Sequence, residues 1–110
     1  MIVAVFRPGK LNDVKEALKE AGIAGITIAE VQGHGRQKGH KEVFRGKEYT
    51  VDLNPKTRVE IAVLDDQVDK VIETVSNSAR TGDVGDGKIF VFPMENACRI
   101  RTGETGVDAL

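Results

Sequence analysis

The pattern of apolar and polar residues along the chain predicts four strands. Residues 2–6 form an apolar run ended by Pro8 and Gly9, which is typical of a buried strand. Residues 26–31 and 57–63 alternate between apolar and polar positions, with Pro55 just before the second stretch. Residues 88–92 form the fourth apolar stretch, and residues 98–101 indicate a further short strand at the sheet edge.

Helical spacing of apolar residues occurs twice, once between the first two strands and once between the last two. Asn12 is a candidate N-cap for the first helix, and Gly22 ends its pattern. Asp65 or Asp66 is a candidate N-cap for the second helix, which we expect to end near Asn77. The apolar positions are Leu11, Val14, Ala17, Leu18 and Ala21 in the first helix, and Val68, Val71, Ile72, Val75 and Ala79 in the second.

The predicted order is strand, helix, strand, strand, helix, strand, which is the order of the ferredoxin-like α+β fold. That fold places both helices on one face of a four-stranded antiparallel sheet. The length of 110 residues fits one domain, residues 1–110. Because the third strand carries the mixed positions Arg58, Glu60 and Ala62 on its other side, we expect further subunits to cover the second sheet face.

The segment 33–53 separates the second and third strands and has a different composition. It combines several glycines with dense charge, and no helical or strand period is evident in it. A connection of roughly twenty residues without secondary structure is uncommon in a small domain and is usually a binding loop, a lid or a linker. We therefore expect this segment to be a functional loop.

Overall charge and cysteine content exclude several classes of protein. Lys and Arg number 16 against 17 Asp and Glu, so the net charge of −1 does not favour nucleic-acid binding. The locally basic stretch 36–47 does not change this, because only Phe44 and Tyr49 could supply stacking rings. The single cysteine, Cys98, and the lack of a signal-peptide pattern or a long apolar run predict a soluble cytoplasmic protein.

The glycine-rich segment 82–88 is the second candidate for chemistry. Its spacing matches part of a P-loop, but Ile89 stands where a magnesium-binding Ser or Thr is required, so it is not a Walker A motif. Glycine amides and Lys88 are still suited to phosphate, and an ordinary turn with a solvated lysine is the alternative. Arg99 and Arg101 would project from the same side of a strand, toward phosphate or toward solvent.

Several ordered motifs together resemble the PII family of nitrogen-regulatory signal transduction proteins, over essentially the whole chain. They are residues 33–40, the run Arg45-Gly46-x-Glu48-Tyr49, the segment 82–91 and the run 99–104. This resemblance implies a homotrimeric, non-enzymatic ferredoxin-like protein that binds ATP or ADP between subunits and 2-oxoglutarate beside ATP. It also implies that the long loop, 33–53, binds an ammonium channel or nitrogen-assimilation enzymes, so that contact with a membrane would be indirect.

The resemblance also implies roles for individual residues. The implied nucleotide-binding residues are Thr27, Gly35, Arg36, Gln37, Glu60, Ala62, Gly85, Asp86, Gly87, Lys88, Arg99 and Arg101. The implied 2-oxoglutarate-binding residues are Arg7, Gln37, Lys38, Gly39 and Lys56. Gln37 would join ATP and the 2-oxo acid around Mg²⁺, a cation that takes oxygen ligands. Tyr49 matches a residue that is uridylylated or adenylylated in some members, and Arg45 matches one that enters an ammonium channel.

Two other functions are weaker. A small phosphotransferase that uses a nucleotide is the alternative on the same fold, but neither His34 nor His40 belongs to a pattern of nucleophile and base. Metal binding by the two histidines lacks a supporting Cys, Asp or Glu at suitable spacing.

Overall fold

The structure is a computed structural model, and it describes residues 1–34, 40–44, 47–51 and 53–110, with only the backbone described for residues 40–44 and 47–51. Its elements follow in the order β1 (Ile2–Phe6), α1 (Leu11–Glu20), β2 (Thr27–Gly33), β3 (His40–Phe44), β4 (Lys47–Val51), β5 (Asn54–Ile61), α2 (Val68–Ala79) and β6 (Gly87–Val91).

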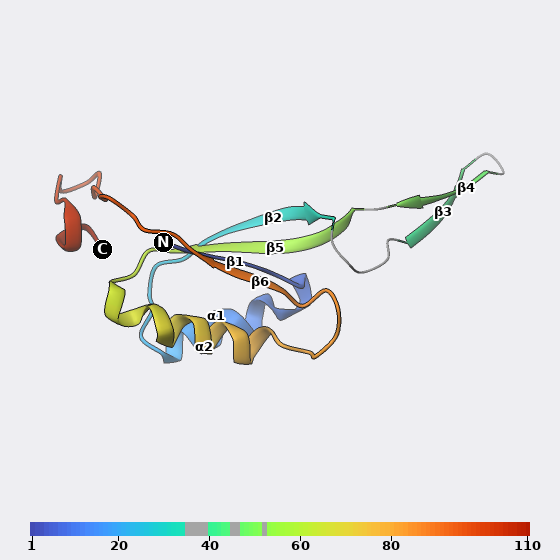
Figure 1. Ribbon diagram of the computed structural model, residues 1–110. Helices are drawn as coiled ribbons and strands as arrows, with labels where there is room; N and C mark the ends of the chain where they lie inside the picture. The colour runs from blue at the N-terminus through green and yellow to red at the C-terminus, as the bar shows by residue number, and fades with distance from the viewer. Residues whose placement is uncertain (35–39, 45–46, 52) are drawn as a thin grey trace.

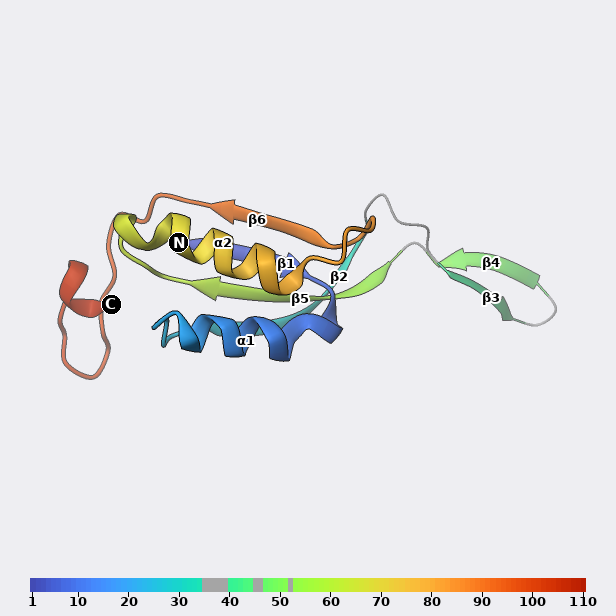
Figure 2. The ribbon, with the colours of Figure 1, turned by 90° about the horizontal axis from the view of Figure 1, so that it is seen from below.

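Four of these strands form one antiparallel sheet in the order β2-β5-β1-β6. Both helices cover the same face of this sheet, as Figures 1 and 2 show from two directions. The predicted ferredoxin-like α+β fold is therefore confirmed. None of the described helices is long and apolar enough to cross a membrane.

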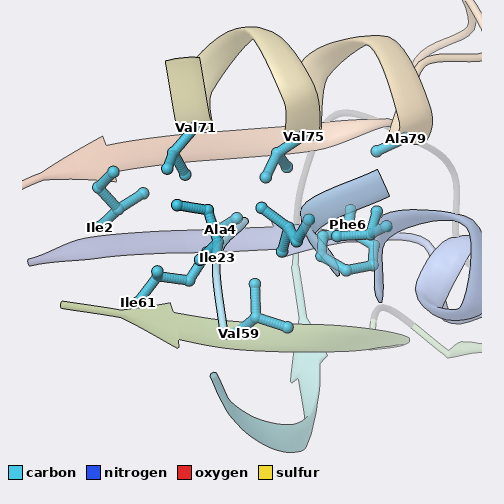
Figure 3. Packing of buried hydrophobic residues seen from close by; sticks show 11 residues of the cluster. Ile2, Ala4, Phe6, Ile23, Val59, Ile61, Val71, Val75 and Ala79 are labelled. Carbon is cyan, nitrogen blue, oxygen red and sulfur yellow. The ribbon is translucent and has the colours of Figure 1, made fainter. Parts of the chain in front are cut away.

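The core lies between the helices and the covered face of the sheet (Figure 3). The inward positions of β5 alternate as predicted, since Val59 and Ile61 are fully buried. Their partners across β1 are Ala4 and Ile2, which are also fully buried. Val71 and Val75 close this layer from α2, and Val14 and Leu18 close it from α1. Burying one such side chain contributes about 1.5–3 kcal/mol, so this layer holds the domain together.

The second face of the sheet is not covered by any described segment of the chain (Figure 1). The strand register places Val5, Arg58 and Lys88 side by side on this face, with Val3, Glu60 and Phe90 in the next row. Phe90 is 45% exposed and Phe92 49% exposed, which is unusual for large aromatic side chains in a small domain. An open, partly apolar sheet face is consistent with the expected assembly of several subunits.

Both helices begin differently from the prediction. A 3₁₀ turn over Pro8–Lys10 precedes α1, so that Lys10 and not Asn12 is the N-cap. The fixed φ angle of Pro8 favours this earlier turn. A second 3₁₀ turn, Asp65–Gln67, precedes α2, and Gln67 is the N-cap in place of either aspartate. At its other end α2 extends to Ala79, two residues beyond Asn77.

The end of α1 follows the prediction. Gly22 has φ of +82° and stands directly after the C-cap Ala21. Its N–H donates to the carbonyl of Lys19, and the N–H of Ile23 donates to the carbonyl of Leu18 at 2.9 Å. This pair of hydrogen bonds is the Schellman motif, which needs a residue that tolerates positive φ.

Strand β5 begins earlier than the sequence predicted, at Asn54, and includes Pro55. Residue Phe6 at the end of β1 pairs with Thr57, so residues 54–56 have only β2 as a described neighbour. A strand position with one neighbour can accommodate a proline, which donates no hydrogen bond. The pairing of Gly33 with Asn54 extends the β2–β5 ladder to the ends of the long segment.

The prediction that residues 33–53 lack secondary structure was wrong. Strands β3 and β4 lie within this segment and form a separate two-stranded antiparallel sheet (Figure 1). The two strands are only two residues apart in sequence, a spacing typical of hairpins. Branched and aromatic residues such as Val43, Phe44, Tyr49 and Val51 favour strands, and they were obscured by the surrounding charge.

Candidate functional site

The glycine-rich segment between α2 and β6 is a tight loop closed by the side chain of Asp86. One carboxylate oxygen accepts hydrogen bonds from the backbone N–H groups of Thr81 and Gly82, both at 2.8 Å. The other accepts a short hydrogen bond from the hydroxyl of Thr81. Gly82, Gly85 and Gly87 have φ angles of +94°, +103° and +109°, which other residues rarely adopt. The loop therefore has a defined shape, fixed by its own residues.

Two cationic side chains connect this loop to the rest of the sheet. Arg7, directly after β1, donates from Nε to Asp86 at 3.2 Å and from Nη2 to the carbonyl of Val84 at 2.7 Å. Lys56, on β5, donates from Nζ to the carbonyl of Gly85 at 2.6 Å. Three successive loop residues are thus bound by cations that are distant in sequence.

The ionisation of Asp86 and Lys56 reflects these contacts. The hydroxyl of Thr81 and then the backbone N–H groups of Thr81 and Gly82 hold the pKa of Asp86 far below its ordinary value of 3.8. Burial lowers the pKa of Lys56 below its ordinary value of 10.5, and the charge of Arg7 lowers it further, while Asp86 partly offsets both. Lys56 is only 9% exposed, so its ammonium group is partly desolvated.

Gly87 has a structural reason to be glycine, in addition to the role that the resemblance implies. It pairs with Phe6 at the start of β6. A Cβ atom added to Gly87 would lie 1.8 Å from the carbonyl oxygen of Val5. The next residue, Lys88, pairs with Val5 and is exposed on the open face of the sheet.

The implied site residues fall at two opposite ends of the sheet. Arg7, Lys56, Gly85, Asp86, Gly87 and Lys88 lie together at the end that carries the glycine-rich loop. Thr27 pairs with Glu60 near the other end, and Ala62 follows β5 there. Glu60 forms an ion pair of 3.1 Å with Arg58 on the open face. One chain does not bring these two groups together.

Arg99 and Arg101 also lie away from the glycine-rich loop, in the C-terminal segment (Figure 1). The short strand expected over residues 98–101 was wrong, because only an isolated bridge joins Cys98 to Thr105 and Arg101 lies in a turn. Arg99 forms an ion pair of 3.0 Å with Glu104. The N–H of Gly103 donates to the carbonyl of Arg99, so the chain reverses here and does not extend as a strand.

The remaining implied residues cannot be placed in the same way. Gly35, Arg36, Gln37, Lys38, Gly39 and Arg45 lie outside the described residues. Tyr49 belongs to β4, of which only the backbone is described. Among the side chains that the structure describes, no group of three or more His, Cys, Asp or Glu residues could hold a metal ion.

The space beside the glycine-rich loop on the helix side of the sheet is small. A crevice of about 150 Å³ lies there, between α2 and the strands β1 and β6, next to Gly87 and Lys88. Pockets for drug-sized ligands and cofactors usually measure roughly 300–1,000 Å³.

Thr81 is a site residue that sequence reasoning missed. Its backbone and its hydroxyl both donate to Asp86, and its hydroxyl also accepts a hydrogen bond from the N–H of Asp83 at 3.2 Å. The available signal was the pair of Thr81 and Asp86 on either side of Gly82 and Gly85, because hydroxyl and carboxylate side chains commonly fix turns through the backbone.

The fold and this site define a ferredoxin-like α+β domain with a glycine-rich loop held by cations at one end of its sheet. The sequence profile of the family described as Nitrogen regulatory protein P-II matches residues 1–104. A protein of that name from Rhizobium meliloti (strain 1021) is 55% identical over 109 residues, which cover 99% of this chain and 97% of the relative. A protein of that name from Pasteurella multocida (strain Pm70) is 54% identical over 109 residues, again 99% of this chain and 97% of the relative.

A third relative, the Nitrogen regulatory protein P-II of Rhizobium etli, is 52% identical over 110 residues, which cover 100% of this chain and 98% of the relative. The chain therefore belongs to the Nitrogen regulatory protein P-II family.

Proposed function

We propose that this protein is a non-enzymatic transducer of nitrogen, carbon and energy status. In this proposal it binds ATP or ADP, adds 2-oxoglutarate in the presence of Mg-ATP, and regulates target proteins through residues 33–53. The targets are an ammonium channel, nitrogen-assimilation enzymes or their regulators. Family membership supports the nitrogen-regulatory role.

The observation that carries the ligand assignment is the convergence of cations at the glycine-rich loop. Arg7 and Lys56 contact the loop directly, and Lys88 follows it on the open face of the sheet. Cationic side chains and glycine amides together offset the charge of phosphate and carboxylate groups. In the proposed site Gly85, Gly87 and Lys88 take the nucleotide phosphates, while Lys56 takes the distal carboxylate of 2-oxoglutarate and Arg7 lines the same pocket.

We propose that the protein is a homotrimer with a nucleotide site in each cleft between subunits. Two observations support this. The open face of the sheet exposes Phe90 and Phe92. The implied ligand residues also lie at opposite ends of the sheet within one subunit. Only a second copy could bring Thr27, Glu60, Ala62, Arg99 and Arg101 close to the glycine-rich loop. Head-to-tail contacts between identical copies form a ring when the rotation between them closes. The family resemblance implies that this ring contains three copies.

Gln37 would connect ligand state to the shape of the long segment. In the proposed complex Mg²⁺ is held by oxygens from ATP, from 2-oxoglutarate and from Gln37, with Arg36, Lys38 and Gly39 alongside. Gln37 lies in the segment that also carries Arg45 and Tyr49, so its recruitment to the metal would change how these residues are presented. Tyr49 would be a possible site of uridylylation or adenylylation.

Calorimetry of 2-oxoglutarate binding tests the central assignment. We expect measurable binding only with Mg-ATP present, because each ligand completes the site of the other. ADP should not support it. Gln37→Ala should abolish 2-oxoglutarate binding and change ATP affinity by less than about tenfold, or ~1.4 kcal/mol. Strong binding of 2-oxoglutarate to the nucleotide-free protein or to this variant would contradict the mechanism.

Two further measurements separate this proposal from its alternatives. Phosphate release from ATP should stay at the rate of the buffer, whereas a phosphotransferase or hydrolase would produce turnover. Light scattering over a range of concentrations should give the mass of three chains. A monomer at all concentrations would remove the basis for a shared site.

A further inference from the structure

The two cations assigned to 2-oxoglutarate already have partners in the glycine-rich loop. Lys56 donates to the carbonyl of Gly85 at 2.6 Å, and Arg7 donates to the carbonyl of Val84 at 2.7 Å. These are consecutive peptide groups of one loop, bound by Lys56 on β5 and by Arg7 directly after β1. A carboxylate that enters this region therefore meets two cations that already donate hydrogen bonds to loop carbonyls.

The partners of Arg7 and Lys56 differ in charge. Arg7 forms an ion pair with the carboxylate of Asp86 at 3.2 Å, in addition to its bond with Val84. The described partner of Lys56 is a neutral carbonyl group. Because a carboxylate carries a full negative charge, it attracts the ammonium group of Lys56 more strongly than the neutral carbonyl of Gly85 does. For Arg7 the same exchange would gain little, because it would replace one carboxylate with another.

We infer that the glycine-rich loop competes with the dicarboxylate for Lys56, and that Arg7 is a positioning residue that acts on the loop through Asp86. This inference rests on the proposed function and refines it. The incoming carboxylate takes the ammonium group from the Gly85 carbonyl. Arg7 keeps its contacts with Asp86 and Val84 and holds the rest of the loop in place.

The surroundings of Lys56 disfavour two partners at once. Lys56 as a whole residue is only 9% exposed, so little open space lies beside it. A carboxylate next to the carbonyl oxygen of Gly85 would place two negative atoms together in a partly desolvated space, which is unfavourable. Gly85 has φ of +103°, and as a glycine it can change its peptide orientation with little steric cost.

Release of Gly85 would connect the two ligand sites directly. Gly85 lies two residues before Gly87 and three before Lys88, the residues proposed for phosphate. A change at the Gly85 peptide therefore alters the backbone that faces the nucleotide. This coupling does not pass through Gln37 or the metal ion, and it must be reciprocal, as all coupling between binding equilibria is.

Backbone amide NMR can follow each contact separately. The N–H of Asp86 belongs to the peptide group of the Gly85 carbonyl, and the N–H of Gly85 belongs to that of the Val84 carbonyl. The ¹⁵N shift of Asp86 thus reports the contact with Lys56, and that of Gly85 reports the contact with Arg7. When 2-oxoglutarate is added to the full-length protein with Mg-ATP, the Asp86 signal should move toward its position in Lys56→Met. The Gly85 signal should stay within the range seen with Mg-ATP alone.

Binding measurements on matched variants test the role of Arg7. Lys56→Met should weaken 2-oxoglutarate binding by roughly a hundredfold, and Arg7→Met by about tenfold or less. Asp86→Asn should have an effect similar to that of Arg7→Met, and the double variant should be no worse than either one, because the two residues act through each other. A Lys side chain at position 7, in Arg7→Lys, should restore most of the affinity by keeping a charge near Asp86.

The outcomes separate this inference from the proposed function. Normal 2-oxoglutarate binding by the wild-type protein with an Asp86 signal that does not move would overturn the competition alone. Equal loss of binding in Arg7→Met and Lys56→Met, with additive effects of Arg7 and Asp86, would make Arg7 a direct ligand contact. No binding by the wild-type protein under any condition would overturn both proposals. The titration of the wild-type protein needs no variant, so a variant that misfolds does not prevent the test.

Discussion

The two ends of the sheet are built in different ways. At the end with the glycine-rich loop, contacts join segments that are far apart in sequence, such as Arg7 with Asp86, 79 positions later, and Lys56 with Gly85, 29 positions later. At the other end, residues 96–110 mainly contact one another, as in the pair Arg99 and Glu104, five positions apart. A groove of about 480 Å³ separates that segment from the start of α2, and Ile100 is 98% exposed.

This difference indicates which end of the sheet a single chain can form without contacts from a second subunit. Long-range hydrogen bonds and a close backbone approach fix the loop end, so its shape does not depend on a partner. The C-terminal end exposes apolar residues and pairs only with itself in the part of the chain that the structure describes. In the proposed trimer, the end of one subunit that carries the glycine-rich loop would contact the end of the next subunit that carries the C-terminal segment.

The largest expected effect is at the loop end, in Gly87→Ala. The new Cβ atom would lie 1.8 Å from the Val5 carbonyl oxygen, and the φ angle of +109° is itself unfavourable for alanine. Strain and overpacking each cost about 1–3 kcal/mol, so we expect a clear loss of stability in urea denaturation. Gly82→Ala is the matched control, with φ of +94° and no atom within 4 Å of the added Cβ. Equal stability of the two variants would show that the close approach of β1 and β6 is not limiting.

The next largest expected effect is a loss of nucleotide affinity, tested by one substitution at each end of the sheet. Lys88→Ala and Arg101→Ala should each weaken ATP binding by roughly ten- to a hundredfold, because each removes a contact of about 1.5–3 kcal/mol. If one site takes Lys88 and Arg101 from neighbouring subunits, a refolded equal mixture of the two variants should regain full affinity in about a quarter of its sites. Calorimetry of the mixture would detect this fraction. A mixture as weak as its components would place both residues in a site within one chain.

The smallest expected effect compares two carboxylates in acid. Because the pKa of Asp86 is lowered by folding, its contribution is complete above the ordinary value of 3.8 and is lost as the pH falls below it. Asp86→Asn should therefore destabilise the protein at pH 7, and the difference from wild type should shrink toward pH 3. Glu104→Gln removes a half-exposed ion pair and should change stability by less than about 1 kcal/mol at pH 7. Thermal unfolding across this pH range measures both, and a constant difference for Asp86→Asn would contradict the assignment.

The fold could be predicted because the helix-covered face leaves a strong pattern in the sequence. Val59 and Ile61, with the polar residues between them, specify a half-buried strand, and Val71 and Val75 mark the buried side of α2. Element boundaries were less certain. Asn12 and Asp65 have the right chemistry for caps, but a 3₁₀ turn ahead of each helix placed the cap elsewhere. Such short turns leave almost no pattern in the sequence.

The residues of the glycine-rich loop could be recognised in the sequence, and the contacts that this loop makes could not. The glycines and Lys88 stand out in the sequence, whereas the contact of Lys56 with Gly85 joins residues whose proximity depends on the whole sheet. The turn at Arg101 was missed for a related reason, because alternation of Arg99, Ile100 and Arg101 resembles a strand. Hydrogen bonds between Arg99 and residues 103–104 outweigh that local preference.

The pairing of Gly33 with Asn54 makes the twenty residues between them a replaceable unit. Both ends of this unit are fixed next to each other by one residue pair of the β2–β5 ladder. For the rest of the domain, the segment is therefore a single loop whose ends are already closed. The entropy of closing such a loop rises slowly with length, by only about 0.6 kcal/mol for each doubling. A change in the length or sequence of this segment should therefore cost the rest of the domain little stability. The same property makes the ladder a suitable graft point for engineered recognition sequences.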